Sequence, residues 1–317
     1  SFGDVATANG YVRPEVDDSS LIEIEEGRHP AVEQMIGSGM FVSNNTVMDT
    51  EQESLLLITG PNMSGKSTYM RQTAIIVLMA QMGSFVPCRR ARIGVCDRVF
   101  TRIGASDNLA SGQSTFFIEM SELANILRNA TRRSLIILDE IGRGTSTFDG
   151  LSIAWATAEY LASDDHRVRT MFATHYHELT VLEEQLPAVH NLSVSVSEDG
   201  SNVVFLHRII DGPASKSYGI HVAKIAGIPK AIRQSASRKL KELEAQSAPM
   251  PATTQITFFD NEIAPEPERV SEEPLPYEDV LKEIRAVDIN SLTPIQALVR
   301  LQEIQNEIKD IDEDSEE

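Results

Sequence analysis

Two apolar segments near the start of the chain predict strands of different kinds. Residues 21–24 (Leu-Ile-Glu-Ile) alternate, as in a half-buried strand, whereas residues 55–59 (Leu-Leu-Leu-Ile-Thr) form an uninterrupted run, as in a fully buried strand. From 67 to 81 the chain is rich in apolar residues and lacks Gly and Pro, which predicts a helix. Gly83 is a suitable residue to end it.

Strand and helix patterns then alternate. Strands are expected at 98–103, 135–139 and 170–174, with helices at 115–130 and 150–162. This order predicts an α/β fold with a mainly parallel sheet flanked by helices. Residues 192–197 and 203–210 flank Asp199-Gly200, which predicts an antiparallel hairpin at the edge of the sheet.

The last hundred residues differ in character. Two helical stretches between 217 and 244, separated by Gly227-Ile-Pro229, resemble a helix-turn-helix. Residues 246–276 are rich in Pro, Glu, Ser and Thr, which predicts a disordered acidic linker. A capped apolar repeat at 293–311 predicts a small helical unit. The expected parts are an α/β domain at 1–212, the helix-turn-helix at 213–245, the linker at 246–276 and the helical unit at 277–312.

Charge and composition narrow the class of protein. The formal net charge is -19, and residues 246–317 hold 18 acidic against 5 basic residues, so -13 of it lies there. That balance argues against a protein that contacts a nucleic-acid backbone over a wide surface.

The sequence has no apolar run long enough to cross a bilayer and no leader, so we expect a soluble cytoplasmic protein. The start at Ser1 suggests a fragment. Cys88 and Cys96 are expected to be free thiols.

A complete P-loop pattern follows the buried strand at 55–59. Its eight residues are Gly60, Pro61, Asn62, Met63, Ser64, Gly65, Lys66 and Ser67. Between a strand and a helix start, the backbone N–H groups and the positive helix end can hold the phosphates of ATP. Lys66 would add a point charge, and Ser67 would ligate Mg²⁺. The alternative is a simple Gly-rich turn.

Two carboxylates end the strand at 135–139, 73 residues after Lys66. In this Walker B pattern, Asp139 can reach Mg²⁺ and Glu140 can polarise the attacking water. His175, at the end of the next predicted strand, could contact the γ-phosphate or support Glu140. Together with His177 and Glu178 it also suggests a metal site, although no further ligands are evident.

A second anion site is predicted before the helix at 115–130. Ser111, Gly112, Gln113 and Ser114 place hydrogen-bond donors at the start of that helix. One chain does not need two such sites for one γ-phosphate, so this loop is expected to cover ATP bound by another subunit. A plain helix cap is the alternative that spacing alone leaves open.

Several long motifs in one order carry a family resemblance. They are Gly60 to Thr68, Ser111-Gly-Gln-Ser-Thr-Phe, Asp139-Glu-Ile-Gly-Arg-Gly-Thr-Ser-Thr147, Phe172-Ala-Thr-His175 and Lys216-Ser-Tyr-Gly-Ile-His221. Over about residues 1–245 the chain resembles the C-terminal ATPase domain of the MutS family of DNA mismatch repair proteins. The resemblance implies an ABC-type P-loop ATPase that forms a homodimer with two ATPs at the interface. Ser111 to Ser114 would complete the site of the partner.

The same resemblance implies further roles. Gly27-Arg-His-Pro30 and Phe41-Val42 would lie near the nucleotide, with Phe41 and His207 against adenine. From the pattern alone, Phe41 would belong to the core. The helix-turn-helix would make subunit contacts instead of reading DNA.

The resemblance also implies partners. Mismatched DNA would be bound through N-terminal domains missing from this chain, and MutL would be a protein partner. Gln255-Ile-Thr-Phe-Phe259 resembles the short peptide by which repair proteins dock on the sliding clamp, although an isolated aromatic pair is the alternative. Residues 277–312 resemble the unit that joins dimers into tetramers.

Three other classes of protein are alternatives to a mismatch repair ATPase. An ABC ATPase of a membrane transporter should carry a Leu-Ser-Gly-Gly-Gln type signature, where this chain has Ala-Ser-Gly-Gln-Ser-Thr. The MutS paralogue of recombination control or ribosome rescue should show a different signature and a nuclease-like domain. An interaction module with vestigial ATPase activity should lack catalytic side chains, and here they are present.

Overall fold

The computed structural model describes residues 1–247, except 38, 105–113, 200–201 and 215–217. They belong to the first of two units into which the chain divides, Ser1–Ala248 and Pro249–Glu317. The predicted clamp peptide Gln255–Phe259, the helical unit 277–312 and the linker from 248 onward therefore lie outside the described residues.

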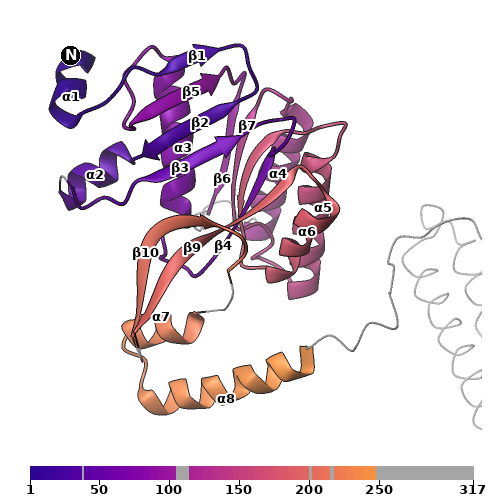
Figure 1. Ribbon diagram of the computed structural model, residues 1–317. Helices are drawn as coiled ribbons and strands as arrows, with labels where there is room; N and C mark the ends of the chain where they lie inside the picture. The colour runs from indigo at the N-terminus through magenta and orange to yellow at the C-terminus, as the bar shows by residue number, and fades with distance from the viewer. Residues whose placement is uncertain (38, 105–113, 200–201, 215–217, 248–317) are drawn as a thin grey trace, which may run out of the picture. The chain divides into compact units, whose positions relative to one another are not determined.

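A six-stranded sheet forms the centre of the described unit (Figure 1). The order β10-β9-β4-β8-β7-β6 makes neighbours of strands that are far apart in the sequence, and all pairs except β9–β10 are parallel. The predicted mainly parallel sheet is confirmed for this sheet, and the predicted hairpin lies at its edge. Its strands are β4 (Leu55–Thr59), β6 (Val99–Ile103), β7 (Leu135–Asp139), β8 (Arg169–Ala173), β9 (Val189–Asp199) and β10 (Asn202–Asp211).

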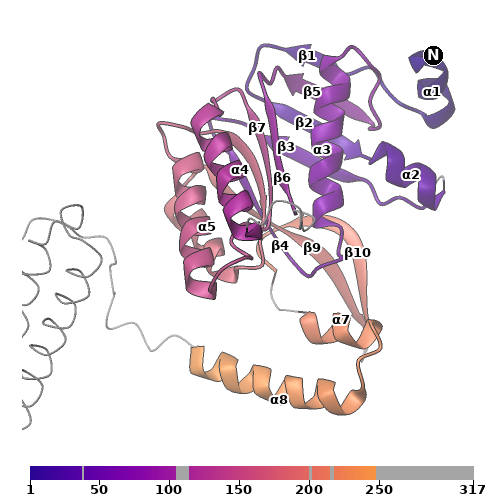
Figure 2. The ribbon, with the colours of Figure 1, turned by 180° about the vertical axis from the view of Figure 1, so that it is seen from behind.

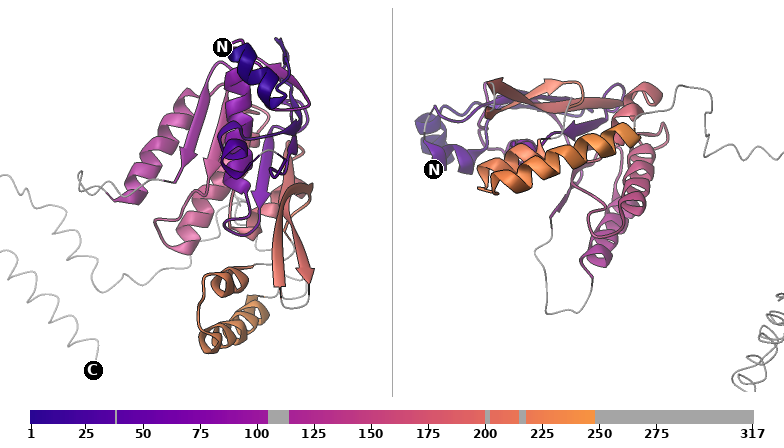
Figure 3. Two further views of the ribbon diagram at one scale, coloured as in Figure 1. Left: turned by 90° about the vertical axis from the view of Figure 1, so that its left-hand side faces the viewer. Right: turned by 90° about the horizontal axis from the view of Figure 1, so that it is seen from below.

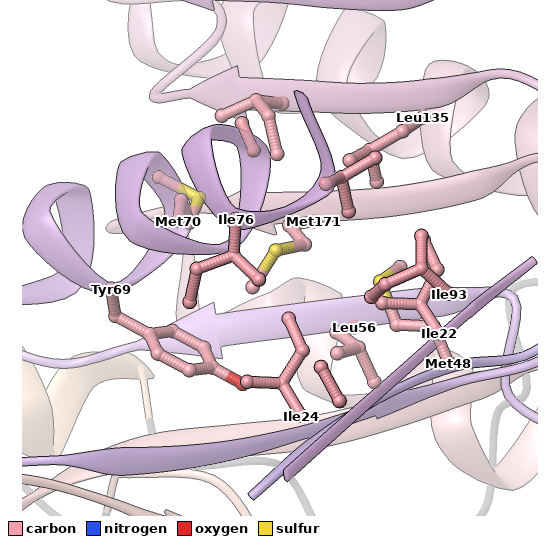
Figure 4. Close-up of a cluster of buried hydrophobic side chains, with 14 of the residues drawn as sticks. Ile22, Ile24, Met48, Leu56, Tyr69, Met70, Ile76, Ile93, Leu135 and Met171 are labelled. Atoms are coloured by element: carbon pink, nitrogen blue, oxygen red, sulfur yellow. The ribbon is translucent and has the colours of Figure 1, made fainter. Parts of the chain in front are cut away.

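Each face of this sheet has its own apolar core because the side chains of a strand alternate between faces. In β4, Leu56 and Ile58 join the cluster under α3 (Figure 4), whereas Leu55 and Leu57 join the cluster under α4 and α5. The views from behind and from the side show α4 and α5 on one side and α3 on the other (Figures 2 and 3). The elements that cover the sheet are α3 (Lys66–Gln81), α4 (Thr115–Asn129), α5 (Thr147–Ala162), η1 (His177–Val181) and α6 (Leu182–Gln185).

A second sheet of four strands, in the order β1-β5-β2-β3, was not predicted, although the strand expected at 21–24 is confirmed as its half-buried strand β2. Its strand β2 pairs antiparallel with both β3 and β5, whereas β1 pairs parallel with β5, so this sheet is mixed. Ile22, Ile24, Met48 and Ile93 of this sheet pack in the α3 cluster, so α3 lies between the two sheets. The elements of this part are α1 (Phe2–Asn9), β1 (Glu15–Asp17), β2 (Ile22–Gly27), α2 (Pro30–Ile36), β3 (Asn44–Met48) and β5 (Arg90–Gly94).

Two helices follow the hairpin, α7 (Gly219–Ile225) and α8 (Lys230–Ser247). The turn between them contains Gly227 at φ +84°, a conformation that Gly adopts without strain. Tyr218, immediately before α7, packs edge-on against Phe205 of β10, with ring centroids 6.5 Å apart. None of the described helices has the length and apolar character that crossing a membrane requires.

One buried guanidinium ties several loops to the central sheet. Arg169, at the start of β8, is only 1% exposed. It donates hydrogen bonds to four backbone carbonyls in three separate segments of the chain. The acceptors are Ser20 O and Gly94 O at 3.2 Å, Val95 O at 3.3 Å and Arg133 O. Because the guanidinium is buried, these bonds pair its charge with carbonyl groups and lower the cost of burying both.

Replacing this side chain should therefore destabilise the fold. We expect Arg169→Met to lower the free energy of unfolding by about 3–5 kcal/mol, because several buried carbonyls lose their donor. Urea denaturation followed by circular dichroism measures it. Arg132→Met is the matched control, because its ion pair with Glu51 is exposed and should contribute under about 1 kcal/mol. Equal losses in the two variants would contradict the role of Arg169.

Candidate active site

The turn between β4 and α3 is built from unusual backbone conformations. Gly60 has φ +135° and Gly65 has φ +110°, which non-glycine residues rarely adopt, and Met63 itself lies at φ +66°. A Cβ at Gly65 would lie 3.2 Å from Nδ1 of His207, so glycine also permits the close approach of that ring. The glycines of the predicted P-loop are thus required by its shape.

The start of α3 has the features of an anion site. Its N-cap residue is Gly65, which provides no side-chain acceptor for the first N–H groups of the helix. Ser64 is fully buried, and its Oγ has no hydrogen-bond partner among the described residues. Unpaired donors at a helix N-terminus suit phosphate oxygens.

Lys66 lies among backbone carbonyls and carboxylates. Its Nζ donates to Gly60 O at 2.6 Å and to Pro61 O at 3.0 Å, and lies 3.9 Å from Oε1 of Glu140. The side chain is only 4% exposed, and burial lowers its pKa to about 8, although Asp139 opposes that shift. Burying an ammonium group is costly, which favours a functional role for it.

Asp139 and Glu140 lie where the parallel register of the sheet places them. Asp139 pairs with Ala173 of β8, and the backbone N–H of Glu140 donates to Ala173 O at 2.9 Å. Glu140 has φ +60° and a buried side chain, which forms ion pairs with Lys66 and Arg143. The predicted P-loop and Walker B residues are therefore brought together at one edge of the sheet.

The opposite wall comes from the second sheet and the hairpin. Phe41 and Val42 precede β3, and His207 lies in a bulge of β10 with φ +55°. The bulge directs this ring to the P-loop, where Nδ1 lies 2.7 Å from Ser64 O. Asn44 joins the two segments, since its Nδ2 donates to His207 O at 3.0 Å and its Oδ1 accepts from Ile209 N at 2.7 Å.

A cavity of about 500 Å³ unites these parts. Most of the predicted ATP and Mg²⁺ residues line it, while Gly60 and Ser64 lie in the loop behind its surface. The lining residues that were predicted are Phe41, Val42, Pro61, Asn62, Met63, Gly65, Lys66, Ser67, Thr68, Asp139, Glu140 and His207. Of the Gly27–Pro30 segment, Gly27 contacts a lining residue, because Gln72 Nε2 donates to its carbonyl at 3.0 Å.

His175 lies outside the cavity lining. It follows β8, is exposed and stacks on Tyr176 with ring centroids 4.1 Å apart. Partial desolvation of the ring by its neighbours lowers the pKa of His175, and the positive charges of Arg143 and Lys66 lower it further. Within the described part of the chain, no group of three His, Cys, Asp or Glu side chains could hold a metal, so His175, His177 and Glu178 do not form a metal site there.

The predicted second anion site is described only at its end. Ser111, Gly112 and Gln113 lie outside the described residues, whereas Ser114 is the exposed N-cap of α4. Its Oγ accepts from Phe117 N at 3.3 Å, the bond expected of a plain helix cap. A contact of Ser114 with another subunit stays a prediction.

Sequence reasoning missed several residues of the cavity lining, among them Arg143 and Asn44. Arg143 was quoted within the motif 139–147 without a role, although an arginine three residues after Glu140 could have suggested an ion pair. Asn44 had no signal in the sequence, because its contacts join β3 to a strand more than 160 residues later.

The family model described as MutS domain V matches residues 56–244, the segment that contains the P-loop, both carboxylates and the hairpin. The chain belongs to the MutS family. Curated relatives agree with this membership. The protein from Ruminiclostridium cellulolyticum, named DNA mismatch repair protein MutS, is 52% identical over 97% of this chain, and its namesake from Caldicellulosiruptor bescii is 53% identical over 97%.

A third MutS relative, from Nitratidesulfovibrio vulgaris, is 51% identical over 96% of the chain. The match covers 35–36% of the length of these three relatives. The chain therefore spans about a third of the MutS proteins that it matches, and what the whole proteins do comes to it only as a proposal.

Proposed function

We propose that the chain binds ATP with Mg²⁺, hydrolyses it, and serves as the ATPase part of a cytoplasmic MutS mismatch repair protein. The observation that carries this proposal is the convergence of the P-loop, Asp139 and Glu140 on one cavity that Phe41 and His207 close on the other side. Phosphate donors, a carboxylate pair and a flat apolar wall are what a nucleoside triphosphate requires.

Phosphate binding is assigned to the start of α3. Its free N–H groups would bind the β- and γ-phosphates, and Lys66 would exchange its bonds to Gly60 O and Pro61 O for phosphate oxygens. Ser67 and Asp139 would hold Mg²⁺, which supplies positive charge to those oxygens when bound.

The hydrolytic step is assigned to Glu140. Its carboxylate would accept a proton from the attacking water, and the ion pairs with Lys66 and Arg143 hold it in place. His175 lies near the same cations and would contact the γ-phosphate or support Glu140.

Adenine binding is assigned to the far wall. Phe41 and His207 offer ring faces for stacking, and Val42 offers an apolar contact. Asn44 would fix the position of these groups relative to each other, because its Nδ2 donates to the backbone carbonyls of Val42 and His207.

The assembly is proposed from the family. Two copies would form a homodimer in which Ser111, Gly112, Gln113 and Ser114 of one cover the ATP of the other, with the α7–α8 helix-turn-helix adding contacts. ATP would then drive conformational switching of a DNA mismatch-recognition clamp, and other domains would read the mismatch.

The proposed partners also include MutL and the replication sliding clamp, the latter bound through Gln255–Phe259. Residues 277–312 would join dimers into tetramers.

Single-turnover ATP hydrolysis tests the enzymatic proposal. Glu140→Ala should bind ATP but hydrolyse it about 10²–10⁴-fold more slowly, because the water loses its base. Lys66→Ala should weaken ATP binding itself by about tenfold or more, because a charged phosphate contact is lost. Glu178→Ala, outside the cavity, is the control. Unchanged hydrolysis in Glu140→Ala would refute the base assignment.

The pH dependence of binding tests the role of Lys66. Its pKa in the protein alone is about 8, and adjacent phosphate favours the charged form and raises that pKa. Binding therefore takes up a proton above pH 8, so affinity should fall up to about tenfold per pH unit above 8 and lose this dependence below it. Fluorescent ATP titrations from pH 7 to 9.5 measure it. Lys66→Arg should remove the dependence, and its persistence there would assign it to another group.

Mixed variants test whether the site is shared between subunits. Ser114→Arg should block the partner's ATP and Lys66→Ala should leave its own site empty, so each variant alone should be inactive. A mixture should regain about a quarter of the wild-type rate per chain, because half of randomly paired dimers hold one complete site. Steady-state ATPase assays at increasing chain concentration measure it. A mixture as inactive as its components would contradict the shared site.

A further inference from the structure

The loop that follows Glu140 is held by a buried carboxylate. Glu119 of α4 is 4% exposed, and its Oε1 accepts a hydrogen bond from the backbone N–H of Gly142. Its Oε2 accepts from Arg102 Nη2 of β6 at 3.2 Å, where the arginine is equally buried. A buried ion pair is weak evidence for stability, so the specific bond to one backbone N–H is the notable feature.

The backbone at Gly142 is fixed from other sides as well. Its carbonyl accepts from Tyr176 Oη at 3.1 Å. Gly142 has φ +92°, and a Cβ there would lie 2.7 Å from the Cα of Gly150 in α5. Two residues later, a Cβ on Gly144 would lie 2.8 Å from the Cβ of Phe116 in the first turn of α4. The loop is therefore pressed between α4, α5 and Tyr176.

Only Ile141 separates this point from Glu140, and Ile141 is fully buried. Glu140 has a left-handed backbone conformation and is joined to Gly142 through a single residue whose side chain is packed in the core. We therefore expect a shift of the backbone at Gly142 to displace Glu140 and its carboxylate. Displacements of about 1 Å are enough to slow a positioned reaction considerably.

We propose that Glu119 is a positioning residue for Glu140. It holds the N–H of Gly142, and through it the carboxylate that the proposed hydrolysis uses, so the inference rests on the proposed function. Since α4 begins directly after Ser114 and Glu119 lies on its second turn, the same bond makes the placement of Glu140 depend on where α4 starts. Glu119 does not itself line the nucleotide cavity.

A pair of double variants isolates the single hydrogen bond. Both variants are made in an Arg102→Met background, so that removing the charge of Glu119 leaves no buried arginine unpaired. Glu119→Gln keeps an acceptor for the N–H of Gly142. Glu119→Met removes that acceptor with little change of shape. We expect both to bind Mg-ATP within about twofold of wild type. Glu119→Gln should hydrolyse at near the wild-type rate and Glu119→Met about tenfold or more slowly.

Glu122→Met is the matched control. Glu122 belongs to α4, as Glu119 does, and its Oε2 lies 3.0 Å from Nε of Arg102. Its replacement should change neither ATP binding nor hydrolysis. Should the Arg102→Met background not fold, Glu119→Gln and Glu119→Met with native Arg102 give the same comparison, because both remove the charge equally.

Equal hydrolysis by the Gln and Met variants, or a parallel loss of binding and hydrolysis in the Met variant, overturns the positioning role. The same assays include wild type and Glu140→Ala. Hydrolysis that survives Glu140→Ala refutes the base assignment of the proposed function, whereas its loss there together with equal Gln and Met rates refutes only the role of Glu119.

Discussion

Burial of both faces of the central strands is the constraint on which the rest of the structure depends. Four residues of β7 and all five of β4 and β8 are buried, so in these three strands charged side chains occur only at the strand ends. Parallel pairing keeps these ends level, with Ile58 and Asp139 both opposite Ala173. The P-loop, the carboxylate pair and His175 therefore leave the sheet at the same edge.

The charges gathered at that edge depend on one another. Lys66 and Glu140 are each less than a tenth exposed. Arg143, whose side chain is about half exposed, forms an ion pair with Glu140. The group is costly as a structural feature, because each ion gives up hydration that its partners only partly replace. Such an arrangement is typical of sites where stability is given up for function.

The elements with strong local signals could be predicted. The apolar run at 55–59, the glycines after it and the helix from Lys66 follow from residues close in sequence, and the helix expected at 150–162 begins only three residues earlier, at Thr147, because Ser146 caps it. The four-stranded sheet was not predicted, although its strand β2 overlaps the strand expected at 21–24, because the partners of β2 lie far along the chain, as β5 does. The propensity of such strands is decided by those neighbours.

The sequence by itself determined the family, the buried strands and the chemistry of Lys66 and Glu140, because each rests on a local pattern that any compact fold must respect. Tertiary structure alone decided what surrounds them. The bulge that directs His207, the bonds of Asn44 across the cavity and the hold of Glu119 on Gly142 join segments 23 to more than 160 residues apart. Local patterns do not encode contacts of this kind, since they exist only once the sheets have packed on α3 and α4.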